Sequence, residues 1–186
     1  MTESIYGFFG YKTIYDEAIQ HLQTGDAIME IGAFLGKSTT YMTNQLTKHN
    51  LDVHFYVLDL WDKKYCSSID SVRNSLTIDD LYPTFFNNIT THGNLKCIIP
   101  LQGKSKDILQ CLRRSFKFIF IDGSHVYEDV YADIQRCKEL VHENGILAGD
   151  DYQHPDVKRA VDELLPDCEI IYGDGNIMYR TRRTWS

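Results

Sequence analysis

No run of apolar residues in this 186-residue chain is long enough to span a membrane, and the first residues, MTESIYGFFGYK, lack the basic start and apolar core of a signal peptide. A positive charge balance is also missing, because 26 Asp and Glu outnumber 19 Lys and Arg and leave a formal net charge of −7. Nucleic-acid backbones are bound largely by clustered Lys and Arg, so this balance argues against a broad nucleic-acid surface. We predict a cytoplasmic protein that binds neither membranes nor nucleic acid.

Close pairs of cysteine are absent as well. The five cysteines stand at positions 66, 97, 111, 137 and 168, a spacing that indicates neither a zinc site nor a full disulfide framework. Hydrophobic residues make up 43% of the chain, which is enough for one compact core but little for two at this length. We therefore predict a single domain over residues 1–186. The oligomeric state stays open, with a homo-oligomer as one alternative.

Residues 27–39, with the sequence AIMEIGAFLGKST, predict a buried strand, a tight turn and the start of a helix. Gly32 and Gly36 bracket the turn, and Glu30 interrupts the apolar strand just before it. Glycine permits a sharp turn and lets a ligand approach the backbone, while the first amides of the helix face outward. The turn is a candidate cradle for a small molecule, although any parallel α/β fold also needs glycine in its connections.

A second apolar run, at 55–58, ends in Asp59. An acid roughly 20 to 30 residues after the first glycine turn is placed to bind a ribose diol. The turn itself departs from the dinucleotide pattern GxGxxG, because Phe34 replaces the middle glycine. Glu30 would repel a pyrophosphate and suits an ammonium group instead.

On these residues the sequence resembles the class I S-adenosylmethionine-dependent methyltransferases. The ExGxxxG turn fits their first motif, and Asp59 fits their ribose-binding acid. The resemblance implies that Glu30 helps to order the methionyl ammonium of the cofactor. In the family, the turn from Gly103 to Ser105 borders the adenine, although Ser105 is equally typical of an ordinary helix N-cap. The candidate cofactor-binding residues are Glu30, Gly32, Ala33, Phe34, Gly36, Ser38, Asp59, Leu60, Trp61, Gly103, Lys104, Ser105 and Asp122.

Strands and helices alternate five times along the chain before a hairpin formed by 169–172 and 176–180. The fifth helix of this pattern begins near 126 and is closed by Gly145, and a short strand follows at 146–148. The pattern predicts an α/β fold with a Rossmann-like, doubly wound, mostly parallel seven-stranded sheet, helices on both faces and a C-terminal antiparallel hairpin. Ligands bind at the carboxyl ends of the strands in such sheets. Five acids fall there: Glu30, Asp59, Asp122, Asp150 and Asp151.

The stretches FIFIDGSHVYEDVYADI and ILAGDDYQHPDVKRAVDEL are the most specific part of the resemblance. They look like the metal-dependent small-molecule O-methyltransferases that include macrolide-sugar and catechol-type enzymes. The resemblance implies transfer of a methyl group to a hydroxyl of a small molecule such as a sugar or a catechol. It does not name the acceptor.

Asp122, Asp150 and Asp151 follow two strands that we expect to be neighbours, about 5 Å apart. Three converging carboxylates repel one another unless a cation or protons intervene, and hard oxygen ligands suit Mg²⁺. In the resembling enzymes the three metal ligands match these positions, although catechol-type members carry Asn at the position of Asp151. The alternative is that Asp122 and Asp150 only cap turns.

His125 is the candidate base, with Asp122 beside it in the catalytic site. The catechol-type base is a lysine at the position of His125, and the sugar-modifying relatives can use an acid at the position of Ser124. Serine is a poor base, which leaves His125, whose pKa a nearby cation would lower. The alternative is a structural histidine with its hydrogen bonds satisfied.

Two segments are candidate walls of the acceptor site. The N-terminal aromatic segment, residues 1–12, holds Tyr6, Phe8, Phe9 and Tyr11 and either packs simply or forms a flap. Residues 61–80 are polar and longer than an ordinary connection, which predicts a lid that orders over the ligand. Trp61 at its start either packs near the adenine or belongs to the edge of the core.

Two other functions remain open on the same fold. The first is an NAD(P)-dependent oxidoreductase, although the missing GxGxxG and the acid at Glu30 disfavour it. The second is a non-catalytic cofactor-binding protein, because a fold alone does not imply chemistry.

Overall fold

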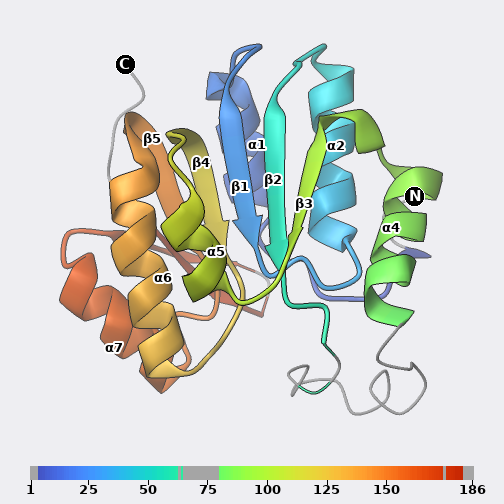
Figure 1. Ribbon diagram of the computed structural model, residues 1–186. Coiled ribbons are helices and arrows are strands. Elements are labelled where there is room, and N and C mark those ends of the chain that lie inside the picture. The colour runs from blue at the N-terminus through green and yellow to red at the C-terminus, as the bar shows by residue number, and fades with distance from the viewer. Residues whose placement is uncertain (1–3, 63, 65–79, 174, 182–186) are drawn as a thin grey trace.

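The computed structural model describes residues 4–62, 64, 80–173 and 175–181 and confirms the predicted Rossmann-like α/β architecture (Figure 1). The described strands form one seven-stranded sheet in the order β3-β2-β1-β4-β5-β7-β6. The first five are parallel, and β7 runs antiparallel to both β5 and β6. The elements are α1 (Lys12–His21), β1 (Ala27–Ile31), α2 (Lys37–Lys48), β2 (His54–Asp59), α4 (Leu81–His92), the 3-10 helix η4 (Leu95–Cys97), β3 (Ile98–Gln102), α5 (Ser105–Cys111), β4 (Phe116–Ile121), α6 (Tyr127–Leu140), β5 (Val141–Gly149), α7 (Pro155–Leu164), β6 (Glu169–Tyr172) and β7 (Ile177–Arg180).

Strand β4, with the sequence FKFIFI, lies between β1 and β5 near the centre of the sheet. Its side chains alternate between the two faces, as in any extended strand. Phe118 and Phe120 pack with α1, α2 and α4, whereas Ile119 and Ile121 pack with α5, α6 and α7. Figure 1 shows the second set of helices on the near face and α1 and α2 behind the sheet. Burial on both faces explains why β4 is almost wholly apolar.

The parallel register aligns the carboxyl ends of four neighbouring strands. Ile31 pairs with Leu58 on one side and Ile121 on the other, and Ile121 pairs with Gly149. The residues that follow these partners therefore form a row at one edge of the sheet: Asp59, Gly32, Asp122 and Asp150. This is the edge at which ligands bind in doubly wound sheets.

The prediction for Gly145 was wrong. Helix α6 ends at Leu140 and the chain passes directly into β5, so Gly145 lies inside the strand and does not close the helix. The register of β5 against β4 shifts between Phe116 and Phe118. A Cβ on Gly145 would stand 2.8 Å from the carbonyl oxygen of Phe116, so glycine is needed because the two backbones approach closely at this irregularity.

The N-cap expected at Ser105 is also displaced. Lys104 occupies the N-cap position, and Ser105 is the first residue of α5. The Ser105 hydroxyl instead hydrogen-bonds Asp133, a buried carboxylate of α6. Buried polar groups are nearly always hydrogen-bonded, so a buried acid without a cationic partner pairs with a nearby hydroxyl. Local sequence patterns do not reveal such a pairing.

The predicted lid lies mostly outside the described residues, which include only 61, 62, 64 and 80 of the segment 61–80. Across the part of the chain that the structure describes, no helix is both long enough and apolar enough to cross a membrane.

Candidate active site

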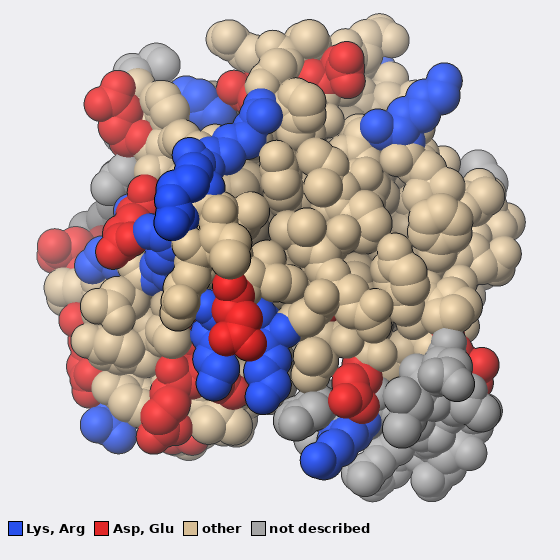
Figure 2. All heavy atoms as spheres, in the orientation of Figure 1, with Lys and Arg blue, Asp and Glu red and all other residues tan. Residues whose placement is uncertain are grey.

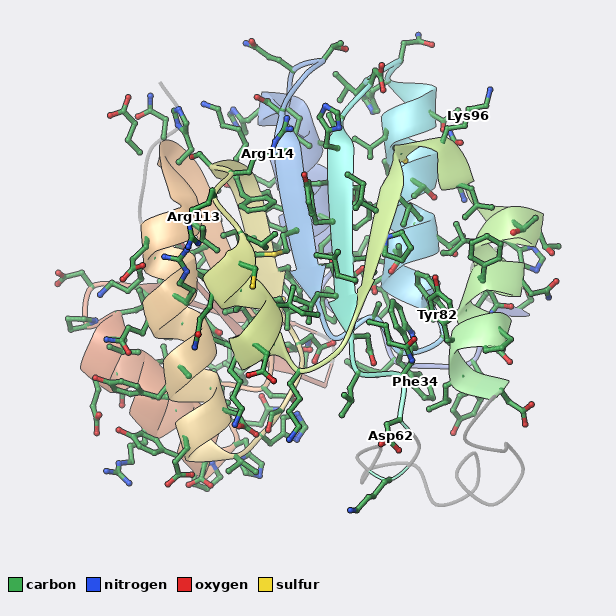
Figure 3. The ribbon with its side chains drawn as sticks, viewed as in Figure 1. Phe34, Asp62, Tyr82, Lys96, Arg113 and Arg114 are labelled. Carbon is green, nitrogen blue, oxygen red and sulfur yellow. The ribbon has the colours of Figure 1, made fainter. Side chains whose placement is uncertain are left out.

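The glycine turn forms as predicted and fits tightly against the loop after β4. Gly32 has a φ of 91°, and a Cβ there would stand 1.8 Å from the carbonyl oxygen of Asp122. Gly36, with a φ of 84°, precedes α2, and its amide donates to the carbonyl oxygen of Ala33 at 2.8 Å. Between them Phe34 has a φ of 47° and lies below the carboxyl ends of the central strands in Figure 3. Only glycine permits both the positive φ and the backbone approach at Gly32.

Glu30 lies beneath this turn and not at its surface. Its side chain is buried, and it accepts hydrogen bonds from the hydroxyls of Tyr15 at 2.9 Å, Thr39 at 2.5 Å and Ser38. Burial raises the pKa of Glu30, and the Ser38, Thr39 and Tyr15 hydroxyls oppose this rise. The carboxylate therefore holds the start of α2 against α1, and the Ser38 side chain stands between it and the cavity above.

Asp59 joins the turn to the end of β2. One carboxylate oxygen accepts the amide of Phe34 at 2.8 Å, and the other accepts the amide of Trp61 at 2.6 Å. Burial raises the pKa of Asp59, while these amides and those of Ala33 and Leu60 favour its charged form. The Phe34 and Trp61 amides, which lie at hydrogen-bond distance, take two of the about four lone-pair sites of the carboxylate, so ribose hydroxyls could donate to the others.

Trp61 belongs to the core and does not project into the cavity. The indole is 2% exposed, and its Nε1 donates to the carbonyl oxygen of Phe34 at 2.8 Å. Its ring packs against Tyr82 and Phe85 of α4, with centroid distances of 4.8 and 4.7 Å. Figure 3 shows Tyr82 on α4 facing the region of Phe34. The structure shows the core-edge packing predicted for Trp61, and its contact with the adenine stays a prediction.

The turn after β3 reaches the same edge. Gly103 has a φ of 151°, and its amide donates to the carbonyl oxygen of Asp59 at 3.0 Å. This bond continues the β2 and β3 pairing by one residue and brings the turn beside Asp59. Lys104 is exposed next to it.

The acids after β4 and β5 act on one another electrostatically. Burial raises the pKa of Asp122 well above its usual range, and the charges of Asp150 and Asp151 raise it further. The pKa of Asp150 rises to about 6, chiefly through burial. Both oxygens of Asp150 accept the side-chain amide of Asn176, at 2.8 and 2.9 Å. A cation between these carboxylates would relieve their mutual repulsion.

The ligand atoms that lie closest together are not the three predicted ones. One atom from each of Asp122, His125 and Asp151 lies within 4.8 Å of the others, and all three side chains are half-buried. His125 Nε2 lies 2.6 Å from a carboxylate oxygen of Asp151, and the imidazole stacks on His154 with centroids 5.2 Å apart. The hydrogen bond with Asp151 raises the pKa of His125, whereas burial opposes it.

The N-terminal aromatic segment lies across this edge, and we call its described part, residues 4–11, the strap. Tyr11 is buried and donates its hydroxyl to Asp122 at 2.8 Å. Phe9 packs against Tyr11 and Tyr15, whereas Tyr6 and Phe8 are 50% and 61% exposed. Between the strap and the glycine turn lies a cavity of about 40 Å³, lined by Tyr6, Gly7, Phe8, Tyr11, Gly32, Ala33, Phe34, Leu35, Lys37, Ser38 and Asp122.

Two residues of this site, Asn176 and Lys37, were missed in the sequence, and so was the contact of a third, Tyr11, with Asp122. Asn176 had a usable signal, because it precedes an antiparallel strand that starts at the edge where β5 ends. Lys37 stands inside the glycine turn motif itself, and its position lines the cavity. Tyr11 had no local signal as a partner of Asp122, since the contact joins residues 111 positions apart.

A family model described as a methyltransferase domain matches residues 29–152, which is most of the chain. The chain belongs to this methyltransferase family. The match begins in β1 and ends just after the Asp150–Asp151 pair, so it spans the glycine turn and the acids described above. The resemblance to class I S-adenosylmethionine-dependent methyltransferases is thereby confirmed. Comparison with curated protein sequences gives no match.

Solved structures with the same fold include several methyltransferases. The O-methyltransferase NovP has a TM-score of 0.71 at 19% identity, over 92% of this chain and 78% of that one. The O-methyltransferase TomG of Streptomyces achromogenes, solved with S-adenosylmethionine, has a TM-score of 0.65 at 16% identity, over 91% and 78%. A putative rRNA methylase from Clostridium thermocellum has a TM-score of 0.68 at 10% identity, over 95% and 96%. At these identities the likeness concerns the fold.

Proposed function

We propose that this methyltransferase transfers the methyl group of S-adenosylmethionine to a hydroxyl group of a small molecule, assisted by a divalent cation such as Mg²⁺. The observation that carries the proposal is the convergence of two chemically different groups on one sheet edge. The glycine turn and Asp59 suit an adenosyl cofactor, and Asp122, His125 and Asp151 suit an acceptor hydroxyl.

The cofactor half of the proposal rests on Asp59 and Ser38. Asp59 accepts the ribose hydroxyls with lone pairs that its backbone partners leave free. Ser38 donates its hydroxyl to Glu30 and lines the cavity, so its oxygen is oriented to accept a hydrogen bond from the methionyl ammonium. Glu30 then acts on the ammonium through Ser38 and through its charge. The bare backbone from Gly32 to Gly36 faces the sulfonium side.

The metal half rests on the acids. Asp122 and Asp151 offer carboxylate oxygens close together, and Asp150 lies near enough for its charge to raise the pKa of Asp122. This donor set fits a hard divalent cation, with Asn176 fixing the orientation of Asp150. When bound, such a cation lowers the pKa of an acceptor hydroxyl.

Methyl transfer is an in-line displacement, so the protein must align the two reactants and remove one proton. The acceptor oxygen forms a bond to the methyl carbon, the carbon–sulfur bond breaks, and its electron pair stays on sulfur. We assign the acceptor proton to His125. The bond to Asp151 orients the imidazole and stabilises the imidazolium that forms.

The charge distribution favours a small acceptor over a nucleic acid. On the face shown in Figure 2, Lys and Arg are interspersed with Asp and Glu over α5, α6 and α7, and they form no broad basic patch there. The net charge of −7 acts in the same direction. Tyr6 and Phe8 of the strap are 50% and 61% exposed, so their rings can provide apolar walls for a planar ring or the apolar face of a sugar.

Binding experiments test the cofactor. Calorimetry is expected to show binding of S-adenosylhomocysteine and no binding of NADH, because the turn lacks the pyrophosphate pattern. Binding of NADH without S-adenosylhomocysteine would instead support an oxidoreductase.

Turnover experiments test the chemistry. Release of S-adenosylhomocysteine is measured with catechols, nucleotide sugars and a short RNA as acceptors. We expect chelator to abolish turnover and Mg²⁺ to restore it. His125→Ala is expected to lower the rate at least about 100-fold, whereas His154→Ala, which alters the imidazole stacked on it, serves as the matched control. Full activity in excess chelator would refute the role of the cation, and methylation of RNA alone would refute the small-molecule acceptor. Cofactor binding without turnover of any acceptor would support a non-catalytic role.

A further inference from the structure

Lys37, the first residue of α2, holds the strap onto the glycine turn. Its Nζ donates to the carbonyl oxygen of Gly7 at 2.8 Å, and the side chain lines the cavity. No carboxylate of the described residues lies in salt-bridge distance of this ammonium. A half-buried lysine whose described partner is one neutral carbonyl oxygen gains free energy when an anion reaches it, because charge-assisted hydrogen bonds are the stronger ones.

The strap leaves little free space over the glycine turn. The cavity under it measures about 40 Å³, whereas drug-sized ligands occupy pockets of roughly 300 Å³ or more. Gly7 has a φ of 134°, and a Cβ on it would stand 3.5 Å from the Phe34 ring, so the strap lies directly on the turn. Tyr11 anchors the far end of the strap through Asp122. The segment around Gly7 must therefore move when a ligand enters, while Tyr11 can stay in place.

The charges around the cavity match the amino-acid end of S-adenosylmethionine, which carries an ammonium and a carboxylate. Among the residues that line the cavity, Asp122 is the acid and Lys37 is the single Lys or Arg. Helix α2 starts at Lys37 without a side-chain cap, so the positive end of its dipole faces the same place. A carboxylate there would meet both the ammonium of Lys37 and the start of the helix.

We infer that Lys37 binds the methionyl carboxylate of the cofactor and that, in doing so, it releases Gly7 and opens the strap. This inference rests on the proposed cofactor. The ammonium has two alternative partners, the Gly7 carbonyl in the free protein and the carboxylate in the complex. Cofactor binding and strap opening are therefore one exchange of hydrogen bonds. In this exchange the amino-acid end of the ligand opens the strap, and the adenosine end does not.

Two ligands separate these ends. S-adenosylhomocysteine carries the carboxylate, and 5′-methylthioadenosine shares the adenosine and the sulfur but lacks the amino-acid end. Calorimetry on wild type and Lys37→Met gives the affinity ratio of the two ligands for each protein. We expect the preference for S-adenosylhomocysteine to fall about ten-fold or more in Lys37→Met. Affinity for 5′-methylthioadenosine should stay equal or rise, because the variant has lost the bond that holds the strap.

Three further measurements complete the test. Lys48→Met, at the far end of α2, is the matched control and should keep the wild-type ratio. Lys37→Arg keeps the charge and should restore most of the preference. Hydrogen exchange of residues 4–11 in the free protein should be faster in Lys37→Met than in wild type, with circular dichroism showing that both are folded.

The outcomes are distinguishable. A wild-type chain that binds neither ligand overturns the proposed cofactor itself. Binding by wild type with an unchanged ratio in Lys37→Met overturns the carboxylate contact. Equal weakening of both ligands in Lys37→Met also overturns it, because it would show a general effect on the site.

Discussion

Because of Asp133, the free energy of unfolding should fall as the pH rises, and replacing Asp133 should remove this contribution. The side chain lies in α6, is 2% exposed, and has one oxygen without a hydrogen-bond partner among the described residues. Burial raises its pKa from 3.8 to about 6, an effect that the hydrogen bond from Ser105 reduces. The folded state therefore binds this proton more tightly than the unfolded state does. The stabilising contribution is complete below the unfolded pKa and is lost as the pH rises through the folded one.

The size of the effect follows from the shift. A shift from 3.8 to about 6 corresponds to about 3 kcal/mol of unfolding free energy, since one unit is about 1.4 kcal/mol. Asp133→Asn keeps the shape and removes the charge, so its stability relative to wild type should rise by about 2.5 kcal/mol between pH 4 and pH 7.5, the rest of the change falling below pH 4. The exposed Asp156→Asn is the control for loss of one negative charge.

Urea unfolding over this pH range measures the difference directly. The quantity compared is the difference in unfolding free energy between variant and wild type at each pH, because the contributions of the other titrating groups cancel in it. A difference that stays constant within about 1 kcal/mol, the error of such extrapolations, would refute the reasoning. A rise that appears equally in Asp156→Asn would refute the assignment to Asp133.

Other perturbations address the site. Gly32→Ala should lower the free energy of unfolding by more than about 3 kcal/mol, because its Cβ would stand 1.8 Å from the Asp122 carbonyl oxygen. Gly25→Ala, with a φ of 95° and nothing within 4 Å of the new Cβ, should lower it by about 1 kcal/mol. Thermal unfolding of the two variants compares these losses. Asp59→Ala should weaken binding of S-adenosylhomocysteine about ten-fold or more, and calorimetry with unchanged affinity would remove its ribose role. Asn176→Ala should weaken Mn²⁺ or Mg²⁺ binding about ten-fold by releasing Asp150 while leaving S-adenosylhomocysteine affinity intact; equal loss of both would point to a general structural effect.

Much of the fold could be predicted because its signals are local. The apolar run at 116–121 and the glycine turn at 32–36 have the right composition whatever surrounds them, and the alternation of strands and helices restricts the topology. Gly145 was misassigned for the opposite reason. A glycine that ends a helix and a glycine that lets two strands approach look alike in the sequence, and the contact with Phe116 decides between them.

For the site, the sequence by itself determined which edge of the sheet carries the chemistry, because the residue after each parallel strand must lie at that edge. It thereby determined the acids at 59, 122, 150 and 151. Only the tertiary structure decided what each side chain contacts: Glu30 is enclosed by hydroxyls, Asp150 is held by Asn176, and Asp122 is held by Tyr11. These contacts join residues far apart in the chain, and a difference of one rotamer or a few ångströms creates or removes them. Periodicity and spacing record the path of the backbone, whereas the partners of a buried polar group depend on how separate elements pack.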